Sequence, residues 1–378
     1  MSIIPDHHWR APAKSIDTWR GKEIPRNERS NVFLPVSESY SGISLKIPIQ
    51  IHRGQEDGPV VFVTAALHGD ELNGTGAIRE LICDENLKLR RGALILVPIL
   101  NLLAFDRHSR YLPDRRDLNR FFPGSNKGSL TARIAHKIFS EIVSRASLGI
   151  DLHTASVRRT NYPNVRADLS NPLAKQLAIE FGSEVILSNP GPDGSLRTEA
   201  TKLGVPTIVM EGGEVWKVEP VIVATAVRGI KNILCSLQMI DGVVDRPDTQ
   251  VVIKTTKWIR ADRGGFLQFH VRPGQIIEQH QPLATNTSLL GQEKNILVSP
   301  FTGVVLGMTT LPAVSPGEPI CHIGQLDHDS HGLELLENRA EAKSLERRTV
   351  KDLASNVLVK SMDTGPPTSN DSKSNLKE

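Results

Sequence analysis

Two histidines and one glutamate stand at the ends of apolar runs, where they could bind a metal ion. His68 and Glu71 follow the apolar run 60–66, and His153 follows the run that begins at residue 148. Imidazole nitrogen and carboxylate oxygen are both donors that a borderline cation such as Zn²⁺ accepts. The His-x-x-Glu spacing alone is weak, because most such pairs are solvated helix residues. On this spacing alone, a capping or ligand-supporting role is the default interpretation of Glu71.

The elements expected around these residues bring them together. Residues 60–66 read as a buried strand, 74–87 have helical spacing and 93–100 read as a strand, which gives a β-α-β unit with a parallel strand pair. Ligands gather at the carboxyl ends of parallel strands, because loops and helix starts open there onto one crevice. The three side chains therefore form a candidate two-His, one-carboxylate set, which leaves a position for water and is typical of catalytic zinc. Asp151 can orient the imidazole of His153 through its second ring nitrogen.

The alternation of strands and helices continues to about residue 240 and predicts an α/β fold, with a mostly parallel or mixed sheet flanked by helices. Further helices are expected at 129–146, 171–181, 198–203 and 221–240, and further strands at 148–152, 185–187 and 206–210. For the first of these helices, Ser129 or Thr131 is the expected N-cap.

The pattern changes after residue 241. Residues 251–324 contain short β-rich runs broken by glycine turns and no helical pattern, with Val-x-Pro-Gly turns at 271 and 314. This indicates a small C-terminal β-barrel. It resembles the half-barrel of biotinyl and lipoyl carrier domains but lacks their lysine motif, so we interpret it as a structural or oligomerisation module.

These patterns predict four segments. They are an N-terminal extension (1–42), an α/β domain (43–242), the β-barrel (250–325), and a helical segment with a disordered tail (326–378).

Composition excludes several classes of protein. The 378 residues carry 45 Lys plus Arg against 42 Asp plus Glu, a net charge of +3, and only 4% are aromatic, so neither nucleic-acid binding nor a basic membrane face is favoured. No apolar stretch approaches the roughly 18 residues that cross a bilayer, and residues 1–22 lack an apolar signal core. We therefore expect a soluble, cytoplasmic protein. The three cysteines lie far apart, which leaves metal binding to histidine and carboxylate.

Four short motifs occur in an order that resembles a known family. They are His-Gly-Asp-Glu at 68–71, Asp-Leu-Asn-Arg at 117–120, Asp-Leu-His-Thr at 151–154, and a glutamate after the apolar strand 206–210. On these motifs, residues 45–240 resemble the succinylglutamate desuccinylase/aspartoacylase family of zinc hydrolases, relatives of the carboxypeptidase A group. The resemblance implies a carboxypeptidase-like fold and one Zn²⁺ per chain, held by His68, Glu71 and His153. A β-barrel is also appended in members of this family.

The resemblance also implies substrate contacts in the arginine-rich segment 106–124. Asn119 and Arg120 are expected to hold a free carboxylate of the substrate, a role that suits a planar guanidinium with two donors. Arg110 is expected to polarise the scissile carbonyl and stabilise the oxyanion, with Arg107 as the alternative. Arg197 is a further candidate for substrate binding, although an ion pair at a helix start explains it equally well.

A catalytic base is expected where the strand 206–210 ends. A carboxylate there, followed by two glycines, can face a crevice with little steric cover. In the family such a glutamate takes a proton from zinc-bound water and passes it to the leaving nitrogen. Glu211 directly follows the strand and is the first choice, with Glu214 as the second.

The resemblance implies a zinc-dependent amidohydrolase that acts on an N-acyl amino acid or a related small amide. Two alternatives stay open at this point. One is a carboxypeptidase-like enzyme acting on short peptides, and the other is a non-catalytic metal-binding or interaction protein. The sequence does not disclose the acyl group, the amine, or whether the chain forms a homo-oligomer.

Overall fold

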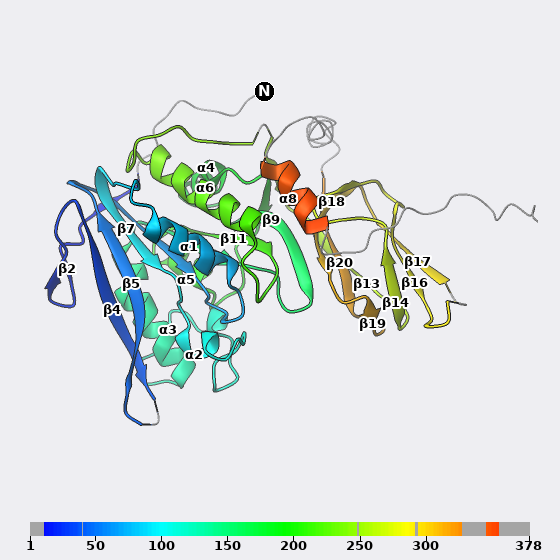
Figure 1. Cartoon of the computed structure of the whole chain (residues 1–378), viewed down its shortest axis with the longest axis horizontal. Coiled ribbons are helices and arrows are strands. Elements are labelled where there is room, and N and C mark those ends of the chain that lie inside the picture. Colours follow the sequence, from blue (N-terminus) through cyan, green and yellow to red (C-terminus); the bar gives the residue numbers. More distant parts are fainter. Residues whose placement is uncertain (1–10, 40, 248, 292–293, 327–344, 355–378) are drawn as a thin grey trace, which may run out of the picture.

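The computed structural model describes residues 11–39, 41–247, 249–291, 294–326 and 345–354 (Figure 1). An α/β unit, with helices on both faces of a long twisted sheet, occupies most of the molecule. The strands that follow residue 250 continue that sheet at one end. None of the described helices is long and apolar enough to cross a membrane.

The central sheet runs in the order β13-β20-β18-β9-β11-β8-β6-β7-β5-β4. Its strands in the α/β unit are β4 (Glu28–Glu38), β5 (Ser44–Arg53), β6 (Glu56–Ala65), β7 (Arg91–Val97), β8 (Leu148–His153), β9 (Arg159–Ala167) and β11 (Thr207–Gly213). Next to β9, β10 (Val185–Ser188) pairs in parallel with β9 and with β12 (Val251–Ile253).

The pairing of this sheet is mixed. Strands β11, β8, β6 and β7 are parallel neighbours at its centre, and the remaining pairs along the path are antiparallel. The predicted mixed α/β fold, with a parallel β6–β7 pair joined through a helix, is confirmed. A mostly parallel sheet is wrong, because the flanking strands are added by antiparallel connections that local patterns do not disclose.

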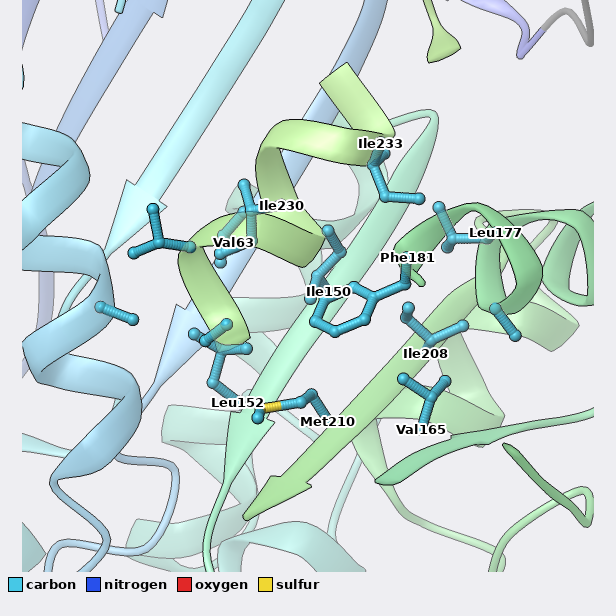
Figure 2. Packing of buried hydrophobic residues seen from close by; sticks show 14 of the residues in the cluster. Val63, Ile150, Leu152, Val165, Leu177, Phe181, Ile208, Met210, Ile230 and Ile233 are labelled. Carbon is cyan, nitrogen blue, oxygen red and sulfur yellow. The ribbon is translucent and has the colours of Figure 1, made fainter. Parts of the chain in front are cut away.

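Helices cover both faces of the sheet. Their bounds are α1 (Asn73–Cys83), α2 (Leu102–Phe105), α3 (Leu130–Glu141), α4 (Pro172–Phe181), α5 (Leu196–Lys202), α6 (Pro220–Ser236) and α8 (Leu345–Ala354). On β6, Val61 and Val63 pack into one core with α1, α4 and α6, whereas Val60 and Phe62 pack into a second core with α3 and α5. This alternation is the two-residue period of a strand buried on both sides. Figure 2 shows the first core, with Phe181 set among residues of β8, β11 and α6.

Local signals fix the helix ends. The side chain of Asn171 accepts hydrogen bonds from the backbone N–H groups of residues 173 and 174, and Gly182 ends α4 in the left-handed conformation. The Oγ of Ser129 accepts from the N–H of residue 132, which confirms Ser129 as the N-cap of α3. Segments 143–145 and 118–120 form short 3₁₀ turns, η2 and η1.

The strands after residue 250 lie in two sheets. Strands β13 (Thr256–Arg260), β15 (Ile276–Ile277), β18 (Gly303–Thr309) and β20 (Pro319–Gln325) belong to the central sheet. Strands β14 (Gly265–Phe269), β16 (Pro282–Thr287), β17 (Lys294–Val298) and β19 (Ala313–Val314) form a second sheet, and both sheets share one apolar core. The expected small β-barrel is not confirmed, because β18 pairs with β9 and joins part of this unit to the α/β sheet. The expected absence of helices in 251–324 holds for the described residues.

The N-terminal segment differs from the sequence expectation. Strand β4 lies inside the segment 1–42 that the sequence assigns to an N-terminal extension, and it forms an edge of the central sheet. Short strands β1 (Ala13–Lys14), β2 (Thr18–Trp19) and β3 (Lys22–Glu23) precede it. At the other end, α8 falls in the predicted helical segment and packs against α6 and β9, while residues 327–344 and the predicted disordered tail 361–378 lie outside the described residues. The domain boundaries stay predictions.

Candidate active site

A pocket of about 310 Å³ opens at the edge of the sheet where β6, β8 and β11 end. Its lining includes all three candidate metal ligands. It also includes the other five residues singled out from the sequence, Arg110, Asn119, Arg120, Arg197 and Glu211. Strand-end positions and one arginine-rich loop thus converge as expected.

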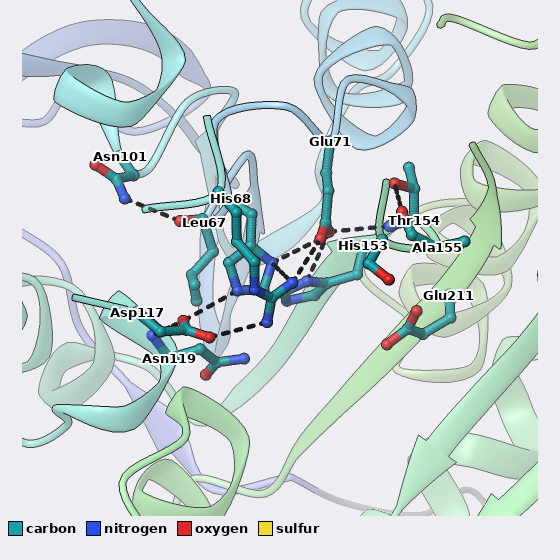
Figure 3. Close-up of polar contacts among 12 residues, drawn as sticks. Leu67, His68, Glu71, Asn101, Asp117, Asn119, His153, Thr154, Ala155 and Glu211 are labelled. Carbon is teal, nitrogen blue, oxygen red and sulfur yellow. Dashed lines mark hydrogen bonds and ion pairs between the residues drawn. The ribbon is translucent and has the colours of Figure 1, made fainter. Parts of the chain in front are cut away.

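The three candidate ligands converge on one point (Figure 3). Nδ1 of His68 lies 2.7 Å from Oε1 of Glu71, and Nδ1 of His153 lies 2.9 Å from Oε2 of the same carboxylate. One donor atom from each residue falls within 4.8 Å of the others, and all three residues are buried. In the described part of the chain this is the one group of three such residues with this geometry.

The second ring nitrogen of each histidine faces an aspartate. Nε2 of His68 lies 3.2 Å from Asp117, and Nε2 of His153 lies 2.8 Å from Asp151. Asp151 in turn accepts a hydrogen bond from the hydroxyl of Thr64 at 2.6 Å. Aspartates that accept from Nε2–H leave the Nδ1 lone pairs free to point at the centre of the cluster, which is the arrangement that outer partners of metal-bound histidines adopt.

The charged side chains of the cluster shift one another's pKa values. Burial alone would raise the pKa of the Glu71 carboxyl, but the charges of His68 and His153 outweigh it and hold that pKa well below its usual range. Burial alone would lower the pKa of His153, but Asp151 and Glu71 raise it well above its usual value. When histidine and carboxylate side chains become ligands of a metal ion, the cation replaces the protons that these side chains would otherwise bind. The donor set therefore fits a borderline divalent cation.

Of the two arginines left open by the sequence, only Arg110 lies in the pocket. Its guanidinium binds Asp117 at 2.9 Å and lies 3.5 Å from Glu71 and 3.3 Å from Nδ1 of His68. Arg107 is exposed on the surface of the loop and does not line the pocket.

Asn119 and Arg120 line the pocket where η1 meets the start of α5. The Asn119 side-chain oxygen accepts from the backbone N–H of Leu196 at 2.9 Å, and this fixes the amide group against α5. Arg120 is exposed, and its guanidinium donates to the backbone carbonyl of Asn119 at 2.7 Å. Both lie where an incoming ligand can reach them.

Glu211 enters the pocket beside the cluster. It is opposite His153 in the parallel register of β11 and β8, so both side chains lie on the same face, and Figure 3 shows them next to each other. The amide of Asn161 donates to its Oε2 at 3.0 Å, and a guanidinium nitrogen of Arg166 lies 3.4 Å from its Oε1. Glu214, the second choice, pairs with Lys217 at 3.1 Å and is not part of the lining.

Arg197 is 5% exposed, and one of its terminal nitrogens has no hydrogen-bond partner within the described residues. The other donates to Asn189 at 2.7 Å. Burial, together with the charge of Arg166, lowers the pKa of Arg197 to about 10. A buried guanidinium with a free donor at a pocket wall favours an anion there. The alternative of an ion pair at the helix start is not seen in the described structure.

Sequence reasoning missed the part of the lining that comes from β9 and the later strands, namely Arg159, Asn161, Arg166, Trp258 and His322. In β9 a bulge opposite residues 211–213 breaks the two-residue alternation. This places Asn161 and Arg166 on one face although they are an odd number of residues apart. Trp258 and His322 reach the pocket only through the pairing of β18 with β9.

Residues 57–237 match the family model described as the succinylglutamate desuccinylase/aspartoacylase catalytic domain. A curated relative, the N-alpha-acetyl-L-2,4-diaminobutyric acid deacetylase of Halomonas elongata, is 26% identical over 264 residues, which cover 66% of this chain and 77% of the relative.

Solved structures share the fold over most of the chain. A succinylglutamate desuccinylase/aspartoacylase from Rhodobacter sphaeroides superposes with a TM-score of 0.69 and 23% identity, over 79% of this chain and 96% of that one. The product-bound ectoine utilization protein EutE (DoeB) from Ruegeria pomeroyi superposes with a TM-score of 0.70 and 23% identity, over 80% of this chain and 98% of that one. At this identity the two structures establish a common fold.

Proposed function

Because residues 57–237 belong to the succinylglutamate desuccinylase/aspartoacylase family, we propose that the protein is a zinc-dependent hydrolase of the amide bond in N-acyl amino acids. The observation that carries the proposal is the convergence of three ligand side chains and Glu211 in one pocket with several arginines. The curated relative supports this choice, since its name describes the removal of an acetyl group from an amino acid.

His68, Glu71 and His153 would hold the zinc ion. The fit rests on the buried Nδ1 atoms and carboxylate that face one point, and on Asp117 and Asp151 behind the imidazoles. Zinc in such a site supplies Lewis acidity, which polarises a carbonyl and makes water a stronger acid.

Glu211 is the proposed general base. It accepts a proton from the attacking water and delivers that proton to the nitrogen of the leaving amine. The amide of Asn161 and the guanidinium of Arg166 hold its two carboxylate oxygens. These contacts fix the orientation of the carboxylate beside the cluster.

The arginines are proposed to orient the substrate. Arg110 lies between Asp117 and the cluster, so its guanidinium can stabilise negative charge that develops on the carbonyl oxygen. Asn119 and Arg120, which also line the pocket, would hold the amino-acid carboxylate. Arg197 contributes its free buried donor to the same anionic substrate.

The test is a hydrolysis assay with a substrate panel. Zinc-loaded protein is incubated with N-acetyl and N-succinyl amino acids and with short peptides, and released acid and amine are both quantified. We expect release of the acyl acid from acyl amino acids. Release of terminal amino acids from peptides alone would instead show a carboxypeptidase.

Glu211→Gln separates chemistry from metal binding. The amide keeps the shape of the side chain but cannot accept the proton, so we expect zinc content to stay near one per chain while kcat falls by about 10²–10⁴-fold. Lys217→Gln, outside the pocket, is the matched control. Full activity of Glu211→Gln, or no hydrolysis of any substrate by the zinc-loaded wild type, would contradict the proposal.

A further inference from the structure

The 214–219 loop joins β11 to α6 and begins three residues after the proposed base. Just before it, the carbonyl of Gly213 accepts a hydrogen bond from the backbone N–H of Ala155 at 3.1 Å. At its other end, the side chain of Asn73 donates to the carboxylate of Glu219 at 2.8 Å and accepts from the N–H of Glu219 at 2.7 Å. Both ends of the loop are therefore held by the segments that directly follow the candidate metal ligands.

Trp216, in the middle of this loop, joins two further segments. Its backbone N–H donates to the carbonyl of Asp70 at 2.8 Å, and Asp70 lies between two candidate ligands in the chain. Its indole N–H donates to the carbonyl of His108 at 3.2 Å, two residues before Arg110. One residue thus connects the backbone beside the metal ligands with the backbone beside the arginine proposed to stabilise the oxyanion.

The backbone of Trp216 and of His108 is in the left-handed region, with φ values of 59° and 48°. This region is unfavourable for residues that carry a Cβ atom, and above all for bulky side chains. Such conformations persist where the surrounding structure fixes them, and they gather at functional sites. Trp216 is 55% exposed, so packing of a buried ring does not explain its conformation. Its two hydrogen bonds to other segments account for it.

The turn at 106–109, which leads into Arg110, has few contacts of this kind. In the described part of the chain, two hydrogen bonds reach this turn from other segments. The N–H of Gly69 donates to the carbonyl of Ser109 at 2.9 Å, and the indole of Trp216 donates to the neighbouring carbonyl. Loss of the indole N–H leaves one of the two, so the turn can shift together with the arginine that follows it.

We propose that Trp216 is a positioning residue for Arg110. It fixes the carbonyl of His108 relative to the backbone of Asp70, and so holds the Arg110 guanidinium beside the ligand cluster. Trp216 does not line the pocket, so it acts through Arg110 rather than on the substrate. The proposal rests on the proposed function, in which Arg110 stabilises negative charge on the carbonyl oxygen. Because that charge develops only in the transition state, a displaced Arg110 lowers kcat and leaves KM almost unchanged.

Trp216→Phe tests this role, since it removes the indole donor and keeps an aromatic ring. The loss of one hydrogen bond is expected to lower kcat by about threefold to tenfold, with KM within about twofold of the wild type. Phe266→Leu, which replaces an exposed ring of the second sheet, is the matched control and should leave both constants unchanged. An unchanged kcat, or a loss carried by KM alone, would overturn the proposal.

A double-mutant cycle separates positioning from general support of the fold. In protein that carries Arg110→Ala, the group that Trp216 positions is absent, so adding Trp216→Phe should lower kcat by less than about twofold. A fall of equal size with and without Arg110 would mean that Trp216 acts independently of this arginine, and the proposal would be rejected.

Hydrogen exchange provides a readout that needs no turnover. The amides of residues 108 and 109 donate to carbonyls within their own turn, so their exchange reports how often the turn opens. Trp216→Phe is expected to speed exchange in the peptide 105–112 severalfold, whereas the peptide covering α4 keeps its rate. This measurement still tests the inference if no substrate is hydrolysed, which separates its failure from failure of the proposed function. Unchanged exchange in 105–112 would refute the connection between Trp216 and the turn.

Discussion

Asp151 allows a quantitative test of how the fold prepares the metal site. One of its oxygens accepts from the hydroxyl of Thr64 at 2.6 Å, and the other faces Nε2 of His153 at 2.8 Å, with both side chains buried. Asp151 thereby fixes the tautomer that leaves Nδ1 of His153 free for a metal. We compare the variants Asp151→Asn and Asp151→Ala, because they remove different parts of this interaction.

The expected losses follow from the contacts. In Asp151→Asn the amide oxygen can still face His153, since the hydroxyl of Thr64 can accept as well as donate. Only the charge is lost, and a charge-assisted hydrogen bond is roughly twice as strong as a neutral one. The expected cost is about 1–1.5 kcal/mol, or about a tenfold weaker zinc affinity. Asp151→Ala leaves the buried N–H unpaired, which costs about 1.5–3 kcal/mol, or about 10–150-fold.

The assay is competition for zinc with a chromophoric chelator at fixed pH. Asp241→Asn is the control, because Asp241 is an exposed partner of Arg90 far from the pocket. The reasoning is refuted if both Asp151 variants bind zinc within twofold of the wild type, or if the asparagine variant is the weaker of the two.

Three further results are expected. His68→Ala and His153→Ala lose bound zinc in metal analysis of the purified protein, and one zinc per chain in either variant would contradict the ligand assignment. Burial, with the charge of Arg29, lowers the pKa of His52 to about 4, so the unfolded state binds more protons between about pH 6.5 and pH 4. The free energy of unfolding should therefore fall by up to about 3 kcal/mol as pH falls through this range, and urea titrations should show a smaller fall for His52→Gln. Burial raises the pKa of the Cys321 thiol to about 12, whereas Cys83 is exposed. A thiol reagent should therefore label Cys83 in the native protein and Cys321 only after denaturation. Rapid labelling of Cys321 in the native protein would show that β20 opens readily.

Local patterns predicted the elements that are apolar and regular. Strands β6 and β8 are built around buried apolar residues, and α3 and α4 have clear caps, so their positions agree with the sequence within a few residues. Strands β4 and β9 were missed for the opposite reason. Each contains a proline and several polar residues, and such segments become strands here because long-range partners satisfy their backbone groups.

Some residues of the candidate site could likewise be predicted from local patterns, and others could not. His153 ends β8, Glu211 lies near the end of β11, and His68 and Glu71 lie in the loop that follows β6. Strand-end reasoning alone therefore placed all four at one edge of the sheet. The remaining pocket residues depend on tertiary pairing. His322 lies within an apolar strand and looks like a core residue in the sequence. Only its register with β18, and the register of β18 with β9, brings it to the pocket.

The order of strands across the sheet has a consequence for biosynthesis. The three candidate ligands are complete when the ribosome has passed residue 153, and the proposed base follows at 211, whereas Trp258 and His322 of the pocket lining come from β13 and β20. Because synthesis proceeds from the N-terminus at about 5–20 residues per second, translation of residues 212–322 separates the proposed base from His322 of the pocket lining by about 5–20 s. During that interval the proposed metal ligands are already synthesised, whereas the side of the pocket that β20 lines is not.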